Sequence, residues 1–194
     1  MRNLVFVLLG VVLSLMLLLA GALGYVRSTG LDARPQPRAI ETRLALAARR
    51  LAVPTVVRTL TNPVPASPEA VAEGMAHYAD HCAACHANDG GGATEVGRNL
   101  YPRAPDMRLA ATQQLSDGEL FYVIEHGIRF TGMPAWGTGT REGEDSTWRL
   151  VHFLRHLPEL TSAELDAMKE LNPRSPEEIR QEIEEDRFLN QGAQ

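Results

Sequence analysis

Two cysteines and the histidine that follows them are the residues of this chain with the most distinctive chemistry. Cys82 and Cys85 stand three positions apart, and His86 comes directly after the second thiol. On a helical turn the two sulfurs lie on one edge, where they can form thioethers to the vinyl groups of a haem, and the next imidazole lies under the iron. The segment therefore predicts one covalently attached haem c, held by Cys82 and Cys85, with His86 as the proximal iron ligand.

The same segment permits a second interpretation, a zinc site. His81 precedes the first cysteine, so that four side chains of zinc-binding type stand within six residues. Structural zinc sites normally draw their ligands from two separated segments, because a tetrahedron closes more easily that way, and this disfavours zinc. These are the only two cysteines in 194 residues, so a chain that gives both to haem has no thiols left for a disulfide framework.

A methionine in a loop containing glycine and proline is the candidate ligand for the opposite face of the iron. Met133 stands in the sequence Thr-Gly-Met-Pro-Ala-Trp, 47 residues after His86. A thioether is a soft, neutral ligand, and His/Met ligation raises the reduction potential of haem iron. Most methionines are core filler, but the flanking Gly132 and Pro134 fix a loop backbone, which a core methionine does not require. We expect Met133 to be the distal ligand, with Met107 as the competing thioether.

Helical signals surround both motifs. A first helix is expected to begin at Ser67, whose side chain can cap it, and to lead directly into the haem motif, with Gly74 giving a low spot where another helix can cross. A capping box begins a second helix at Ser116, and Gly127 ends it. A last core helix is expected to start near Asp145 or Ser146 and to end before Pro158. Between the haem motif and the second helix, glycines and prolines predict a loop that wraps around the cofactor.

The N-terminal segment is long enough to cross a membrane. No charged side chain occurs from Asn3 to Val26, whereas the apolar core of a cleaved signal peptide is about 7 to 15 residues. Residues 1–26 are therefore expected to form a transmembrane anchor. A cleaved signal peptide is the alternative, because Ala20-Gly21-Ala22 is a small-x-small triplet that a signal peptidase can cut. Both interpretations export the rest of the chain.

The segments on either side of the predicted domain differ in charge. Residues 1–60 carry eight Lys or Arg against two Asp or Glu, residues 61–157 carry seven against twelve, and residues 158–194 carry four against ten. None of these segments is typical of a nucleic-acid-binding protein. Residues 27–66 are expected to be a proline-rich linker containing one amphipathic helix over 40–51. Its apolar face either lies on a membrane surface or partner subunit, or packs on the chain's own domain. Residues 159–194 are expected to be an acidic helical tail with a solvated surface.

With these residues in place, residues 67–158 resemble a monohaem class I c-type cytochrome of the bacterial, membrane-anchored kind. The shared features are the first helix, the Cys-x-x-Cys-His motif, the loop around Met133 and the last helix with Trp148. The resemblance implies an all-α class I cytochrome c fold, in which helices and loops wrap around one haem and the first and last helices cross near its edge. It also implies a backbone carbonyl, at Pro102 or Pro105, that accepts the free imidazole proton of His86. The candidates to contact the haem propionates are Tyr101, Trp136, Arg98 and Arg103.

Iron with both axial positions filled by protein has no open site for a small-molecule substrate, which favours outer-sphere electron transfer. We expect a carrier, not an enzyme, that shuttles single electrons between respiratory or photosynthetic complexes and has redox proteins at the membrane as partners. The alternative is a haem c relay subunit of a larger membrane oxidoreductase. A haem peroxidase or gas sensor would require that Met133 does not bind the iron. Because c-type cytochromes of bacteria receive haem outside the cytoplasmic membrane, the resemblance implies a domain on the periplasmic or outer side.

Overall fold

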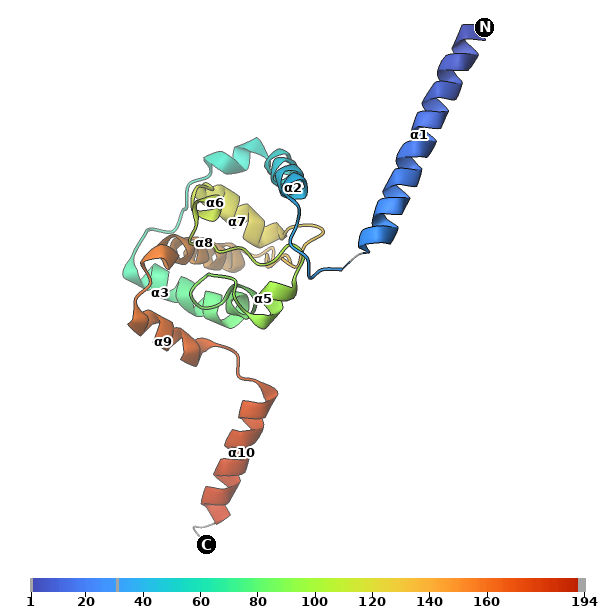
Figure 1. The fold of residues 1–194 in the computed structure, drawn as a ribbon. Helices are drawn as coiled ribbons and strands as arrows, with labels where there is room; N and C mark the ends of the chain where they lie inside the picture. Colours follow the sequence, from blue (N-terminus) through green and yellow to red (C-terminus); the bar gives the residue numbers. More distant parts are fainter. Residues whose placement is uncertain (1, 31, 192–194) are drawn as a thin grey trace. The chain divides into compact units, whose positions relative to one another are not determined.

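All regular structure in residues 2–30 and 32–191, which the computed structural model describes, is helical (Figure 1). The chain separates into two units, residues 1–35 and residues 36–194. The first unit is the apolar N-terminal helix, and the second contains both predicted motifs. The expectation of an all-helical protein is confirmed.

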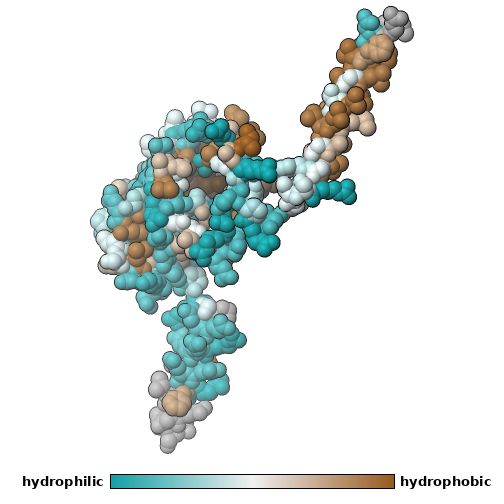
Figure 2. All heavy atoms as spheres, viewed as in Figure 1, coloured by the Kyte–Doolittle hydropathy of each residue, from teal (hydrophilic) through white to brown (hydrophobic). Residues whose placement is uncertain are grey.

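The first unit contains one long helix, α1 (Arg2–Thr29). Figure 2 shows hydrophobic side chains over most of it. Residues Asn3–Thr29 have the length and composition of a membrane span, with a mean hydropathy of 2.9, and an export signal has the same properties. The helix extends a few residues past the expected boundary at residue 26, because Arg27, Ser28 and Thr29 continue its backbone hydrogen bonding.

The second unit is built around a helix that begins at the predicted serine cap. The Ser67 hydroxyl accepts a hydrogen bond from the backbone N–H of Ala70 at 3.1 Å, and Pro68 occupies the first helical position. From there α3 (Pro68–His77), the π-helical turn η2 (Tyr78–Cys82) and α4 (Ala83–His86) follow one another without a break. The Cys-x-x-Cys-His motif therefore lies at the C-terminal end of a helical segment of almost twenty residues.

That segment crosses the longest helix of the domain, α8 (Arg141–His156), at Gly74. A Cβ atom at Gly74 would lie 2.8 Å from the Arg149 carbonyl carbon and 3.0 Å from the Phe153 Cβ. Next to the crossing, the rings of Tyr78 and Phe153, both fully buried, pack with centroids 5.0 Å apart. The close approach of the two backbones thus lets large side chains of both helices pack together beside the crossing. The core also includes Trp148, Leu150, Val151, Leu154 and Leu157.

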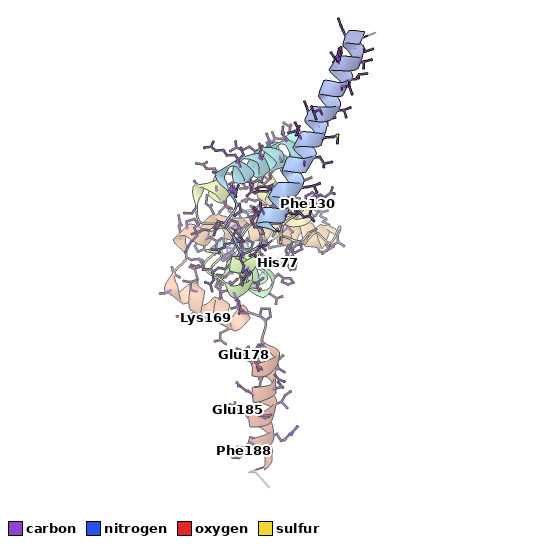
Figure 3. The ribbon with its side chains drawn as sticks, turned by 45° about the vertical axis from the view of Figure 1, so that its right-hand side comes forward. His77, Phe130, Lys169, Glu178, Glu185 and Phe188 are labelled. Carbon is purple, nitrogen blue, oxygen red and sulfur yellow. The ribbon has the colours of Figure 1, made fainter. Side chains whose placement is uncertain are left out.

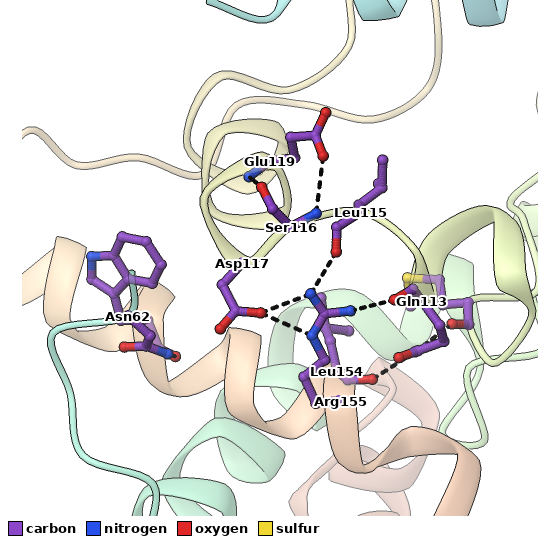
Figure 4. Close-up of polar contacts among 10 residues, drawn as sticks. Asn62, Gln113, Leu115, Ser116, Asp117, Glu119, Leu154 and Arg155 are labelled. Atoms are coloured by element: carbon purple, nitrogen blue, oxygen red, sulfur yellow. Dashed lines mark hydrogen bonds and ion pairs between the residues drawn. The ribbon is translucent and has the colours of Figure 1, made fainter. Parts of the chain in front are cut away.

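A partly exposed ion pair connects α7 (Asp117–His126) to α8 (Figure 4). The Arg155 guanidinium donates to the Asp117 carboxylate at 2.7 and 2.9 Å and to the backbone carbonyls of Gln113 and Leu115. Beside it, Ser116 forms the predicted capping box with Glu119, and α7 ends at Gly127, where φ is 64°. Arginine satisfies carbonyls at a chain reversal that would otherwise be without partners.

Seven further elements complete the described chain. They are α2 (Ala39–Ala52), η1 (Thr55–Thr59), α5 (Glu95–Asn99), α6 (Ala110–Gln113), η3 (Leu157–Glu159), α9 (Ser162–Leu171) and α10 (Pro176–Gln191). The acidic segment is divided between two of them. α9 buries Met168 completely against the core, whereas Glu178, Glu185 and Phe188 lie on α10 (Figure 3), and Phe188 is 78% exposed.

The expected start of the last core helix near Asp145 or Ser146 is wrong, because α8 begins at Arg141. The Thr140 hydroxyl accepts a hydrogen bond from the Gly143 N–H at 3.1 Å and caps the helix. The first turn also carries Glu142 and Glu144, which complement the helix dipole. The apolar spacing that marks the core face begins at Trp148, about two turns after the start of the helix.

The helix crossing can be tested by adding a single methyl group. Gly74→Ala should destabilise the folded domain by about 1–3 kcal/mol, because the new methyl meets backbone that cannot yield. If the crossing were loose, the same substitution would stabilise the helix by up to about 1 kcal/mol. Chemical denaturation of the oxidised protein followed by circular dichroism measures the difference. Ala72→Gly, at an exposed position of the same helix, gives the propensity effect alone.

Candidate haem site

The two cysteines and His86 end the helical segment at the wall of a cavity. The cavity has a volume of about 390 Å³ and a mostly apolar lining, which is within the size range of cofactor pockets. Cys82, Cys85 and His86 line it from one side, and Met133 and Trp136 line it from another. The remaining lining residues come from the segments 37–49, 81, 100–105, 128 and 131–134.

Burial favours the neutral forms of Cys82 and His86. It raises the pKa of the Cys82 thiol to about 12, with the Cys85 charge as a smaller cause. Burial also lowers the pKa of His86, and the backbone of Pro105 opposes this effect. Neutral imidazole is the form that binds a metal ion. In the described part of the chain, the buried Nδ1 of His86 has no regular hydrogen-bond partner. The Pro105 backbone is one of the two carbonyl positions that the resemblance implied for this proton, and its contact with the ring falls outside regular hydrogen-bond geometry.

The loop after the motif is bonded to the motif backbone. Gly92 donates its N–H to the His86 carbonyl at 2.8 Å, and the Thr94 hydroxyl donates to the Cys85 carbonyl at 3.1 Å. The buried Tyr78 hydroxyl donates to the Ala87 carbonyl at 2.9 Å. At Gly97 a side chain would collide with the Cys85 carbonyl and with the Thr94 hydroxyl, so glycine is required for this approach. These bonds hold the carboxyl end of the helix, where backbone carbonyls would otherwise be unpaired.

The backbone of Met133 is held on both sides. Its N–H donates to the Thr131 hydroxyl at 3.1 Å, and its carbonyl accepts from the Ile128 N–H at 3.1 Å. The loop is joined to α7 by the Trp136 N–H, which donates to the Ile124 carbonyl at 3.0 Å. The thioether thus enters the cavity from a short, internally bonded loop, not from the hydrophobic core.

The competing methionine lies elsewhere. Met107 is 8% exposed, belongs to the hydrophobic core and is absent from the cavity lining. Three histidines are also outside the lining, and each has its own partner: His126 the Tyr122 carbonyl, His152 the Val64 carbonyl, and His156 the Glu164 carboxylate. Among the side chains proposed for propionate contact, Tyr101, Trp136 and Arg103 line the cavity. Arg98 instead donates to the Ala93 carbonyl and is not in the lining.

The zinc interpretation finds no geometric support. Among residues 2–30 and 32–191, no three His, Cys, Asp or Glu side chains come together in a way that would hold a metal ion. His81 packs edge-on against the rings of His77 and Trp136, with centroids 5.0 and 5.2 Å away, and its Nδ1 lies 3.0 Å from an Asp80 carboxylate oxygen. The residues fit a planar group bound in the cavity better than a tetrahedral ion.

A wall of the cavity comes from α2, which the sequence did not indicate. Glu41, Ala45, Leu46 and Arg49 line the cavity together with the haem motif. The helix is joined to the loop after the motif, because the Tyr101 hydroxyl donates to the Glu41 carboxylate at 2.9 Å. The sequence pattern predicts contacts only for the apolar face of this helix. On the face that lines the cavity, Glu41, Ala45 and Arg49 recur at a spacing of four residues, with Leu46 beside them. This spacing is a weak signal, because many exposed helices share it.

The helical fold, the Cys-x-x-Cys-His motif and the cavity are those expected of a cytochrome c domain, a class that implies electron transfer. Residues 69–154 match the family described as "Cytochrome C oxidase, cbb3-type, subunit III". This stretch of the chain is therefore a cytochrome c domain of monohaem class I type, as the resemblance implied. The matched residues begin at α3 and end near the end of α8, so α1, α2, α9 and α10 lie outside them. No curated protein matches the chain.

The contact between α2 and the cavity can be tested by removing one hydroxyl. Tyr101→Phe should loosen α2 by about 0.5–1.5 kcal/mol, the usual net value of a hydrogen bond. The backbone amides of α2 should then exchange with solvent roughly 2- to 10-fold faster, as measured by hydrogen-exchange mass spectrometry. Tyr122→Phe, whose ring stacks on His126 away from the cavity, is the matched control. Equal exchange in the two variants would show that this bond does not hold α2.

Proposed function

We propose that this protein is a membrane-tethered electron carrier with one haem c, attached through Cys82 and Cys85 and ligated by His86 and Met133. The observation that carries the proposal is that the motif histidine and a methionine with a fixed backbone line the same apolar cavity. When bound there, the haem would supply one-electron redox chemistry at its iron. The long apolar helix α1 supports a tether, and with it a domain on the outer side of the cytoplasmic membrane.

The chain's own residues perform three tasks in this proposal. The thiols of Cys82 and Cys85 would attach the group, and the neutral imidazole of His86 and the thioether of Met133 would ligate its iron. The apolar lining excludes water. A bound haem would be less charged in its reduced form, so this environment would favour reduction and raise the reduction potential of the haem. The helix α2 covers part of the same lining. If both side chains hold the iron, no position is left for a substrate, and the chain's role would be to pass single electrons to and from partner proteins.

Met133 and Met107 allow a matched test of the axial ligand. Met133→Leu preserves volume and removes the sulfur, so the reduced variant should bind carbon monoxide rapidly and its reduction potential should fall on the order of 100 mV. Met107→Leu, in the core, should change neither property. Spectrophotometric titration with carbon monoxide and a potentiometric titration give the two readings. A wild-type protein that itself binds carbon monoxide rapidly and completely would indicate a peroxidase or gas sensor instead.

A relay subunit of a larger membrane oxidoreductase is the second candidate. Two observations favour it: the matched family is described as an oxidase subunit, and α2 covers part of the cavity that a mobile carrier would present to its partners. A carrier that meets several partners in turn needs a small and open contact surface.

Fractionation of cells that attach haem tests the tether and separates the two candidates. We expect a haem-stained band at full-length mass in the membrane fraction. A shorter, soluble haem band would mean that α1 is a cleaved signal. Purification in mild detergent should then give the protein alone, which supports the shuttle, whereas stoichiometric partner subunits would support the relay. The absence of a haem band from both fractions would contradict the central proposal.

A further inference from the structure

We propose that the outward face of α2 binds the surface of an anionic phospholipid bilayer and holds the haem cavity beside the membrane. This inference rests on the tether proposed above. It concerns the two faces of this helix, which have different surroundings. Its inner face, with Glu41, Ala45 and Arg49, lines the cavity.

The outer face of α2 is an apolar stripe without a covering element. Ile40, Leu44 and Leu51 recur at spacings that place them on one side of a helix, and their exposed fractions are 59%, 64% and 87%. Ala47 lies among them and is exposed as well. Figure 2 shows hydrophobic atoms gathered where α2 lies on the globular part. Large aliphatic side chains exposed in a row on one helix mark a binding surface and not a random scatter.

The charge around the stripe fits an anionic surface. Residues 30–58 contain six arginines and two acidic residues, Asp32, which pairs with Arg34, and Glu41, which lines the cavity together with Arg49. Arg43 and Arg50 stand one turn from Ala47, on the flank of the stripe, and both are exposed. A helix that lies in a membrane interface has this composition: an apolar face that enters the acyl region, and arginines at its edge that reach the lipid phosphates. The cytochrome domain itself, by contrast, is acidic.

The position of α2 in the chain also favours lipid over a soluble partner. Only residues 30–38 separate the end of α1 from the start of α2. An extended chain of that length spans at most about 30 Å, so a tethered α2 cannot leave the neighbourhood of the bilayer. Because its other face lines the cavity, docking would place the haem site about one helix diameter, roughly 10 Å, from the lipid surface. That position suits a redox partner whose own centre is bound in the membrane.

Thiol reactivity in the full-length, haem-loaded protein tests the proposal. Both native cysteines are consumed by haem, so Leu44→Cys provides a single free thiol in the stripe, and Lys169→Cys provides one on α9 as a control. Each variant is placed in nanodiscs of phosphatidylglycerol or of phosphatidylcholine, and its reaction with a membrane-impermeant maleimide is timed. In phosphatidylglycerol the thiol at position 44 should react at least about tenfold more slowly than in phosphatidylcholine, and the thiol at position 169 should react equally in both.

A charge-reversed background keeps the test specific. Adding Arg43→Glu and Arg50→Glu to Leu44→Cys should restore fast reaction in phosphatidylglycerol, while the haem spectrum stays unchanged. Equal reactivity at positions 44 and 169 in both lipids would overturn the proposal. Protection at position 44 that occurs only in native membranes would overturn it too, in favour of a protein partner. If the purified protein has lost α1, the tether fails, and slower reaction at position 44 with phosphatidylglycerol vesicles would still support lipid binding by α2.

Discussion

The close contact of two backbones at Gly74 is the constraint on which the rest of the cytochrome domain depends. It brings the helical segment that starts at Ser67 against α8, and it leaves room beside it for Tyr78 and Phe153. The haem motif is the continuation of that same segment. The orientation of the crossing therefore sets the direction in which Cys82, Cys85 and His86 face, although none of them takes part in it. The same helix crossing therefore determines both the packing of the core and the position of the haem motif.

Two loops finish the site, and each is stabilised by local hydrogen bonds rather than by a large buried surface. The loop after His86 is bonded to the carbonyls at the end of α4, and the loop around Met133 is closed by Thr131 and Ile128. Short-range bonds of this kind fix the backbone with few residues. They leave the space between the loops open for a large planar group, which a well-packed loop interface would fill.

Much of this arrangement is readable from the sequence because it depends on local chemistry. The serine caps at positions 67 and 116, the stop at Gly127 and the Cys-x-x-Cys-His spacing each specify their structure within a few residues. The predicted start of α8 is wrong, because Thr140 acts as a cap eight residues before the apolar pattern begins at Trp148. The Arg155 bonds to Asp117 and two carbonyls, and the cavity-lining role of α2, join positions far apart in the chain. Such contacts are decided by tertiary packing, and no single segment records them.

The contacts of α2 and η1 with the domain change what the forty residues between the apolar helix and the cytochrome domain can do. A fully extended linker of that length would reach about 130 Å. Here Val57 of η1 is buried, its carbonyl stands where a side chain at Gly118 would collide, and α2 lines the cavity. Residues 30–38 are then the length of chain between α1 and the domain, and fully extended they would span about 30 Å. Because searched volume scales with the cube of reach, a tethered domain would explore on the order of a hundredfold less space, so its encounters would be confined to immediate neighbours in the membrane.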